Sequence, residues 1–208
     1  MQGKLVEHRQ IDLDAAPGAA CVVTHLTDEA EPRWAGMVEL GASQTYTLDA
    51  GMRYNLYVLR GTLEIDDQPL NTDDFLIQCG DATLRAGQHG ARLLVHREAS
   101  VTVCEPTVQP AAGRSWHDGR NPQMRVALLS DNGYRMSLVA WQPGAHTVDH
   151  GHSKGEEIFV LSGELRDGDQ HYPAGSWVRL HPGARHEPFV SQPTVILLRN
   201  GHLPAMPS

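Results

Sequence analysis

The sequence predicts an all-β protein made of two tandem domains, and three observations lead to that expectation. Many short runs rich in β-branched and aromatic residues are separated by Gly, Pro, Asp and Asn, while helix-length periodic patterns are nearly absent. Short strands at this spacing are typical of a sandwich or a barrel. Blocks of the first half recur in the second half at one fixed offset, which indicates two tandem domains. The length of 208 residues is compatible with one large β domain or with two small ones.

The expected strands follow one another along the whole chain. The runs that carry the pattern are CVVTHL (21–26), YNLYVLRGTLEI (54–65), DFLIQ (74–78), ARLLVHR (91–97), MSLVAW (136–141), EIFVLSGEL (157–165), SWVRL (176–180) and TVILLRN (194–200). Each run is short enough for one strand and is bounded by turn-forming residues.

The internal repeat pairs two separate blocks at the same offset of 102 residues. LYVLRGTLEI (56–65) matches IFVLSGELRD (158–167), and DDFLIQ (73–78) parallels GSWVRL (175–180). Gly61 and Gly163 then occupy equivalent positions. A chance recurrence of a strand, a glycine and a second strand is the alternative, but agreement at one offset favours duplication.

The repeat sets the expected domain boundaries. We expect a first β domain over residues 1–104 and a second over residues 123–208. The stretch EPTVQPAAGRSWHDGRNP (105–122) is rich in Pro, Gly and polar residues and is expected to be the linker.

Composition narrows the classes of partner and compartment. The formal net charge of −8 argues against a general nucleic-acid-binding surface. No apolar run approaches the roughly 20 residues of a membrane span, and the N-terminus lacks a secretory apolar stretch. Cys21, Cys79 and Cys104 are odd in number and far apart, so we expect a cytoplasmic protein with free thiols.

The stretch DHGHSKGEE (149–157) holds the candidate metal ligands. His150 and His152 point to one face of a strand, because side chains alternate along a strand. Glu156 follows across a tight turn, and His186 lies after a further turn in HPGARHEP (181–188). Three imidazoles and one carboxylate suit a divalent first-row metal and leave a position for water or substrate.

The spacing of these residues resembles the two cupin motifs. The first motif has a Gly, five residues, HxH, three or four residues, Glu, six residues and a Gly. The sequence matches it with Gly144, His150, His152, Glu156 and Gly163. This spacing selects Glu156 over Glu157, which we expect to face away from the metal toward a basic residue. In the second motif, Gly175 precedes His186 by eleven positions, while His181 and Val190 depart from the usual Pro and Asn.

Within the cupins, residues of about 115–200 resemble the cupin domain of ChrR-type anti-sigma factors. The phrases that carry this resemblance are PGAHTVDHGHSKGEEIFVLSGELRD and YPAGSWVRLHPGARHEPF. The resemblance implies two jelly-roll barrels and a zinc site at His150, His152, Glu156 and His186. Related cupins with the same ligands carry iron, manganese or nickel, and they act as dioxygenases or isomerases.

The first half of the chain departs from ChrR-type proteins. Those proteins carry a helical N-terminal domain with an HxxxCxxC zinc motif, which this sequence lacks, so binding of a sigma factor is not supported. At the repeat offset, the four ligand positions correspond to Leu48, Ala50, Tyr54 and about Leu84. We expect a degenerate cupin domain without metal ligands, with packing or homodimer formation as its role ahead of binding an organic ligand.

Two functions follow from the predicted metal centre. The first is a regulatory or sensor protein with one divalent metal, zinc foremost, and a small-molecule ligand in the C-terminal barrel. The second is an enzyme, a dioxygenase or isomerase, whose metal activates a chelating substrate such as a diketone. The sequence identifies no catalytic acid or base, and a storage scaffold fits this length less well.

Overall fold

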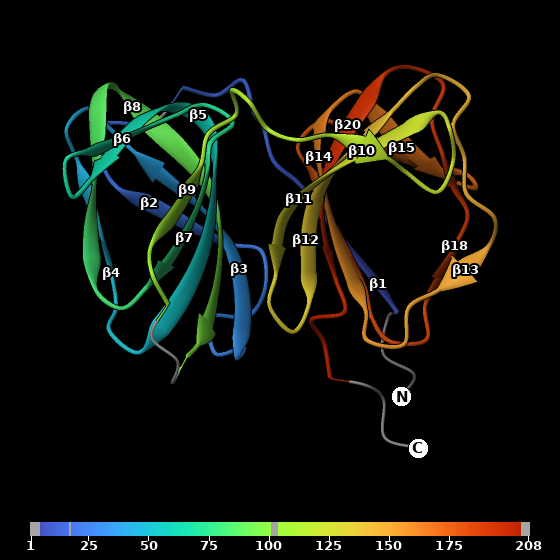
Figure 1. Cartoon of the computed structure of the whole chain (residues 1–208), viewed down its shortest axis with the longest axis horizontal. Helices are drawn as coiled ribbons and strands as arrows, with labels where there is room; N and C mark the ends of the chain where they lie inside the picture. The colour runs from blue at the N-terminus through green and yellow to red at the C-terminus, as the bar shows by residue number, and fades with distance from the viewer. Residues whose placement is uncertain (1–4, 17, 101–103, 205–208) are drawn as a thin grey trace. The chain divides into compact units, whose positions relative to one another are not determined.

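The computed structural model describes residues 5–16, 18–100 and 104–204, and it consists of strands joined by turns and loops (Figure 1). The chain divides into two compact units, one formed by residues up to Asp14 together with those from Ser115 onward, the other by Ala15–Arg114. Within the described ranges no helix is long and apolar enough to cross a membrane. The prediction of an all-β protein is confirmed.

The unit formed by Ala15–Arg114 is built on one antiparallel sheet. Its strands are β2 (Val22–His25), β3 (Arg33–Leu40), β4 (Thr45–Leu48), β5 (Met52–Ile65), β6 (Gln68–Asn71), β7 (Phe75–Cys79), β8 (Ala82–Ala99) and β9 (Thr107–Gln109). The main order is β2-β3-β8-β5-β7-β9, with β4 paired to β8 and β6 paired to β5. The two long strands β5 and β8 pair along most of their lengths, with register shifts near Arg60 and Leu63. The sheet encloses a core of aliphatic and aromatic side chains.

The other unit contains three sheets. Its strands are β1 (Val6–Gln10), β10 (His117–Asp118), β11 (Met124–Asp131), β12 (Arg135–Trp141), β13 (His150–Gly151), β14 (Glu156–Ser162), β15 (Glu164–Asp167), β16 (Gln170–Pro173), β17 (Ser176–Leu180), β18 (Arg185–His186), β19 (Pro188–Phe189) and β20 (Thr194–Asn200). The large sheet has the order β1-β17-β14-β20-β12-β11-β10. The small sheets are β13-β18 and β16-β15-β19.

The sequence repeat corresponds to a structural repeat. The start of β3 at Arg33 corresponds to that of β12 at Arg135, and β6 at Gln68 corresponds to β16 at Gln170, all at the offset of 102. Gly61 and Gly163 both have positive φ, 83° and 77°. A Cβ at either position would lie within 2.5 Å of backbone oxygen on the neighbouring segment, so only glycine fits there.

The division between the units differs from the expected boundaries at two places. Strand β1 pairs with β17, from Val6↔Leu180 to Gln10↔Ser176, and so belongs to the C-terminal sheet. Strand β9 pairs with β7 and so extends the first unit beyond residue 104. Short polar strands at a sheet edge carry little hydrophobic pattern, which explains why the expected linker contains β9 and β10.

The expectation of three free thiols is wrong. Cys79, at the end of β7, and Cys104 form a disulfide with a Cα–Cα distance of 5.5 Å, while Cys21 is free and exposed. The two bonded cysteines are 25 residues apart, and only the return of the chain after β8 brings them together.

Candidate metal centre

Three histidine side chains converge at the small sheet β13-β18. His150 and His186 are direct cross-strand partners, and their Nε2 atoms lie 3.1 Å apart. The Nε2 atom of His152 also lies 3.1 Å from that of His186. One nitrogen from each of the three rings falls within 4.8 Å of the others, which is the arrangement of a group that can hold a metal ion.

Glu156 lies beside this group at the start of β14. Its Oε2 is 3.4 Å from Nε2 of His152, and its Oε1 is 3.6 Å from Nε2 of His186. The residue is 4% exposed. The SKG turn brings it there, since Gly155 has a positive φ of 65° that a residue with a side chain seldom adopts.

The backbone orients the ring of His150. Its Nδ1 lies 2.8 Å from the carbonyl oxygen of Val148, so Nδ1–H donates to that oxygen. The proton is then held on Nδ1, and Nε2 presents its lone pair to the other histidines. This is the tautomer that a metal-binding imidazole needs.

Burial keeps the ring nitrogens neutral. It is the main cause that lowers the pKa of His152 to about 4 and that of His186 to about 3, and the neighbouring His150 lowers both further. Burial also raises the pKa of Glu156 to about 7, against the hydrogen bond from Asn200 and the charge of Arg120. Neutral imidazoles beside a desolvated carboxyl form a donor set that a divalent cation fits, because the cation restores the lost solvation of the carboxylate.

Asn200 is a member of the site that sequence reasoning missed. It pairs with Glu156 across β14 and β20, and its amide nitrogen donates to Oε2 of Glu156 at 2.7 Å. The same nitrogen lies 3.0 Å from Nδ1 of His152. Asn200 therefore contacts both Glu156 and His152. No motif spacing points to this residue, because its position depends on the register of β20.

A cavity of about 700 Å³ extends from the cluster into the barrel. Its volume is in the range of small-molecule sites. Apolar side chains form most of the wall, among them Met124, Val139, Trp141, Ile158, Ile196 and Leu198. The three histidines, Glu156 and Asn200 line the same cavity, so a molecule bound there can reach them.

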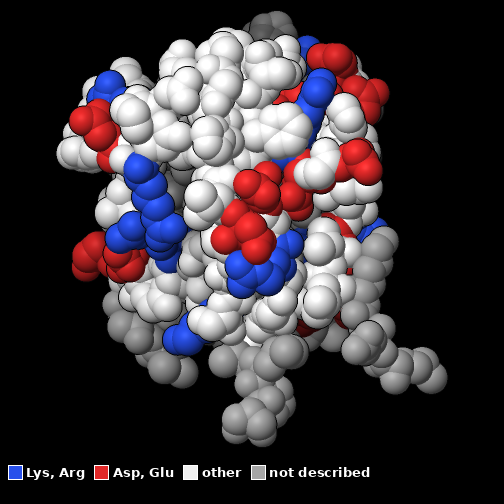
Figure 2. Space-filling view, turned by 90° about the vertical axis from the view of Figure 1, so that its right-hand side faces the viewer, with Lys and Arg blue, Asp and Glu red and all other residues white. Residues whose placement is uncertain are grey.

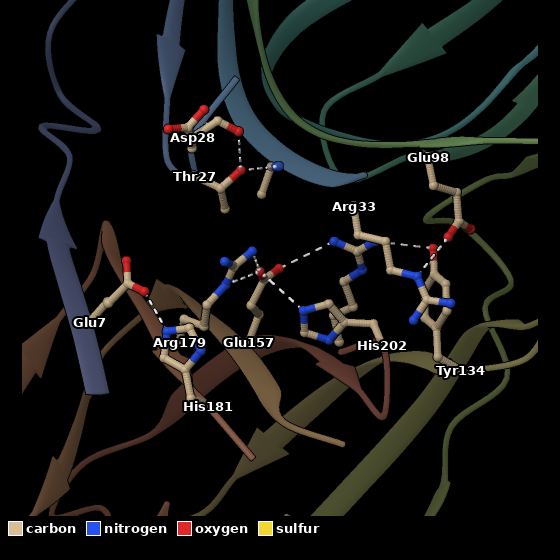
Figure 3. Close-up of polar contacts among 12 residues, drawn as sticks. Glu7, Thr27, Asp28, Arg33, Glu98, Tyr134, Glu157, Arg179, His181 and His202 are labelled. Carbon is tan, nitrogen blue, oxygen red and sulfur yellow. Dashed lines mark hydrogen bonds and ion pairs between the residues drawn. The ribbon is translucent and has the colours of Figure 1, made fainter. Parts of the chain in front are cut away.

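Glu157 faces the opposite side of β14, as the sequence predicts. It is 2% exposed, and its Oε1 lies 2.6 Å from Nη2 of Arg179 and 3.1 Å from Nε2 of His202. Its Oε2 lies 3.4 Å from Nη1 of Arg199. Figure 3 shows Glu157 between Arg179 and His202. Arg179 and Arg199 are its cross-strand partners on either side, so this buried ionic cluster ties together three central strands.

The remaining polar residues near the motif contact other groups. Asp149 pairs with Arg185 at 2.7 Å, and His146 approaches the carbonyl oxygen of Gly144. His171 lies 3.4 Å from Glu164, and His181 pairs with Glu7 of β1. None of these contacts is directed to the histidine cluster.

The equivalent positions in the first unit are filled mainly by core residues. Leu48, Tyr54 and Leu84 are fully buried in its hydrophobic cluster, while Ala50 is exposed. Tyr54, which takes the place of Glu156, donates its hydroxyl to Asp49. These side chains offer no set of metal-ligand atoms at the four positions.

Comparison with known proteins finds a matching family model for part of the chain and solved structures with a similar fold. Residues 105–204 match the model of the ChrR cupin-like domain. Similar solved structures are a putative glyoxylate-induced protein from Pseudomonas aeruginosa (14% identity, TM-score 0.77, covering 96% of this chain and 90% of that one) and a putative dioxygenase from Nostoc punctiforme (12%, 0.69, 94% and 83%). An oxalate decarboxylase variant from Bacillus subtilis is also similar (12%, 0.70, 95% and 78%). At these identities the likeness shows the fold alone. We find no curated protein with significant similarity.

Proposed function

We propose that this chain, in which residues 105–204 form a ChrR cupin-like domain within a fold of two tandem cupin domains, binds one divalent metal ion and a small ligand in its C-terminal domain. The convergence of His150, His152 and His186 carries this proposal. The protein then acts as a regulatory or ligand-sensing module whose metal centre lies in the wall of a cavity.

The ligand set proposed for the metal is His150, His152, Glu156 and His186. The three imidazoles supply neutral nitrogen donors, and Glu156 supplies the one negative charge. Zinc is the metal that we propose first, and iron, manganese or nickel fit the same nitrogen and oxygen donors. Asn200 would hold the Glu156 carboxylate in place through the hydrogen bond described above.

A metal-dependent dioxygenase or isomerase is the second candidate, and the cavity favours it. The cluster lines a space large enough for a small organic substrate, so the metal would not be enclosed by protein. A bound metal would supply Lewis acidity toward a chelating substrate such as a diketone. The chain's own apolar wall would orient that substrate and exclude water from it.

The charge distribution does not support nucleic acid as a partner. Figure 2 shows Lys and Arg side chains interspersed with Asp and Glu on the face that it presents. Together with the formal net charge of −8, this mixture lacks the basic stripe that neutralises phosphates. A second β unit stands where ChrR-type anti-sigma factors have a helical domain, so we do not propose binding of a sigma factor.

The identity of the native metal is the decisive measurement. Protein purified without added metal is expected to contain about one divalent metal per chain by elemental analysis. His152→Ala should lose that metal, whereas His171→Ala, which removes an exposed histidine, should keep it. Absence of metal from wild-type protein, or full retention by His152→Ala, would contradict the proposal.

Oxygen uptake separates the two candidates. Iron content together with oxygen consumption on a panel of β-diketones and catechols supports the enzyme. Zinc content without turnover, combined with saturable binding of a small ligand, supports the sensing module.

A further inference from the structure

Arg120 is a cationic group in the wall of the cavity that also contains the histidine cluster. It lies in the loop between β10 and β11, and its side chain is exposed. His152 and Glu156, two of the residues that would hold the metal, line the same cavity as Arg120.

Three other arginines of the same unit, of which Arg135 also lines the cavity, each have a carboxylate partner. Arg135 lies 3.6 Å from Asp131, and Arg185 lies 2.7 Å from Asp149. Arg125 pairs with Asp118, the one aspartate of the cavity wall, at 3.6 Å. Among the residues that the structure describes, no hydrogen bond or ion pair engages Arg120. Its five N–H groups are thus available to a ligand.

The charge balance of this end of the cavity favours an anion. A divalent metal with three neutral imidazoles and one carboxylate keeps a net charge of +1, and Arg120 adds another. The apolar wall formed by Met124, Ile158, Ile196 and Leu198 favours an uncharged body on the same molecule.

We propose that Arg120 binds the carboxylate of a small organic acid, whose apolar body occupies the barrel cavity. Arginine binds carboxylates through two parallel hydrogen bonds, which gives it both strength and direction. This inference rests on the metal site proposed above, because an acid with a neighbouring oxygen, such as a 2-oxo acid, would contact the metal and Arg120 together.

Calorimetric titration of the full chain with 4-methyl-2-oxopentanoate and with its methyl ester tests the inference. The two probes have nearly the same size and oxygen donors, and they differ in the charge. The acid should bind at least about tenfold more tightly than the ester, since a charge-assisted pair is lost in the ester. Equal affinities, or binding of neither probe by metal-loaded protein, would overturn the proposal.

Substitutions of Arg120 test whether this residue causes the preference for the acid over the ester. Arg120→Gln should lose about tenfold in affinity for the acid and leave the ester unchanged, and Arg120→Lys should keep part of the preference. Arg185→Gln, which removes a paired guanidinium outside the cavity wall, is the matched control and should keep the full preference. Loss of the preference in Arg185→Gln, or its retention in Arg120→Gln, would overturn the assignment.

Elemental analysis of the same samples separates the two proposals. A chain without metal refutes the proposed metal function and the joint contact of the acid with a metal, and a preference for the acid that depends on Arg120 then supports the contact with that residue alone. A chain with metal and no preference supports the metal function and overturns the role of Arg120.

Discussion

Asn200 and Glu156 are cross-strand partners, and the Asn200 amide donates to Oε2 of Glu156 at 2.7 Å. Asn200→Ala removes this hydrogen bond, and residues that support a ligand in this way typically contribute about 10–100-fold to metal affinity. We expect a loss of that size in competition with a chromophoric chelator. Asn132→Ala, at an exposed turn, is the control and should keep wild-type affinity. Unchanged affinity in Asn200→Ala would show that Glu156 needs no such support.

Glu156 and Glu157 are adjacent, but they should respond oppositely to the same substitution. Glu156→Gln should lose metal and fold normally. Glu157→Gln should keep its metal but destabilise the fold by roughly 3 kcal/mol or more, because Arg179 and Arg199 would lose the buried charge that they contact. Metal content and chemical denaturation of both variants check this pair of expectations. Equal loss of metal in both variants would contradict the assignment of the two faces.

The stability of metal-free protein should depend on pH through Glu156. Its pKa is raised from the ordinary 4.5 to about 7, so the folded state holds a proton that the unfolded state has released between these values. The contribution of Glu156 to the free energy of unfolding therefore falls as pH rises from 4.5 to about 7. The lowered pKa values of His152 and His186 have the opposite effect. As pH falls below about 6.5 these histidines become protonated in the unfolded state before they do so in the folded state, so the free energy of unfolding falls.

Glu156→Gln isolates the carboxyl contribution to this pH dependence. Thermal denaturation in chelator from pH 5 to 8 should show the variant gaining stability relative to wild type as pH rises. A difference that stays constant over this range would contradict burial of an ionisable carboxyl at this position.

Gly163 should be far less tolerant of alanine than Gly133. Both have positive φ, 77° and 75°, but a Cβ at Gly163 would lie 2.3 Å from the carbonyl oxygen of Pro193, whereas nothing lies within 4 Å of one at Gly133. Gly133→Ala should cost about 1–2 kcal/mol from backbone conformation alone. Gly163→Ala should cost at least roughly 2 kcal/mol more, because the neighbouring segment must move. Denaturant titration of the two variants measures the difference, and equal costs would argue against the close approach.

The Cys79–Cys104 disulfide should stabilise the fold by about 3–4 kcal/mol, the value typical for a loop of this length. Replacing both cysteines by serine should lower the melting temperature, and a reducing agent should lower that of wild type to a similar degree. Cys21→Ser removes the exposed free thiol and should melt like wild type. A thiol assay of unfolded, unreduced protein should find one free thiol, and three would contradict the disulfide.

Features that depend on local pattern were predictable from the sequence. Alternating β-branched runs predicted the strands, and the repeat predicted the correspondence of Gly61 with Gly163. The HxH spacing identified His150 and His152, and the second cupin motif identified His186. The structure brings the three together, although their role as metal ligands stays a prediction. Side-chain alternation placed Glu156 and Glu157 on opposite faces, and the motif spacing assigned Glu157 to the face away from the metal.

Features that depend on the register and return of distant segments were not predictable. Asn200 contacts Glu156 only because β20 pairs with β14 in one register. Arg120 shares a cavity with the histidines because a loop without any strand pattern returns to the barrel. The disulfide likewise joins two cysteines whose spacing carries no motif.

The pairing of β1 with β17 has a consequence for synthesis of the protein. Val6 meets Leu180 in that ladder, so β1 has no partner until the intervening residues up to β17 have been synthesised. During that interval the unit formed by Ala15–Arg114 can already fold. Closure of the C-terminal sheet therefore follows synthesis of β17, and until then the backbone edge of β1 has no partner in that sheet.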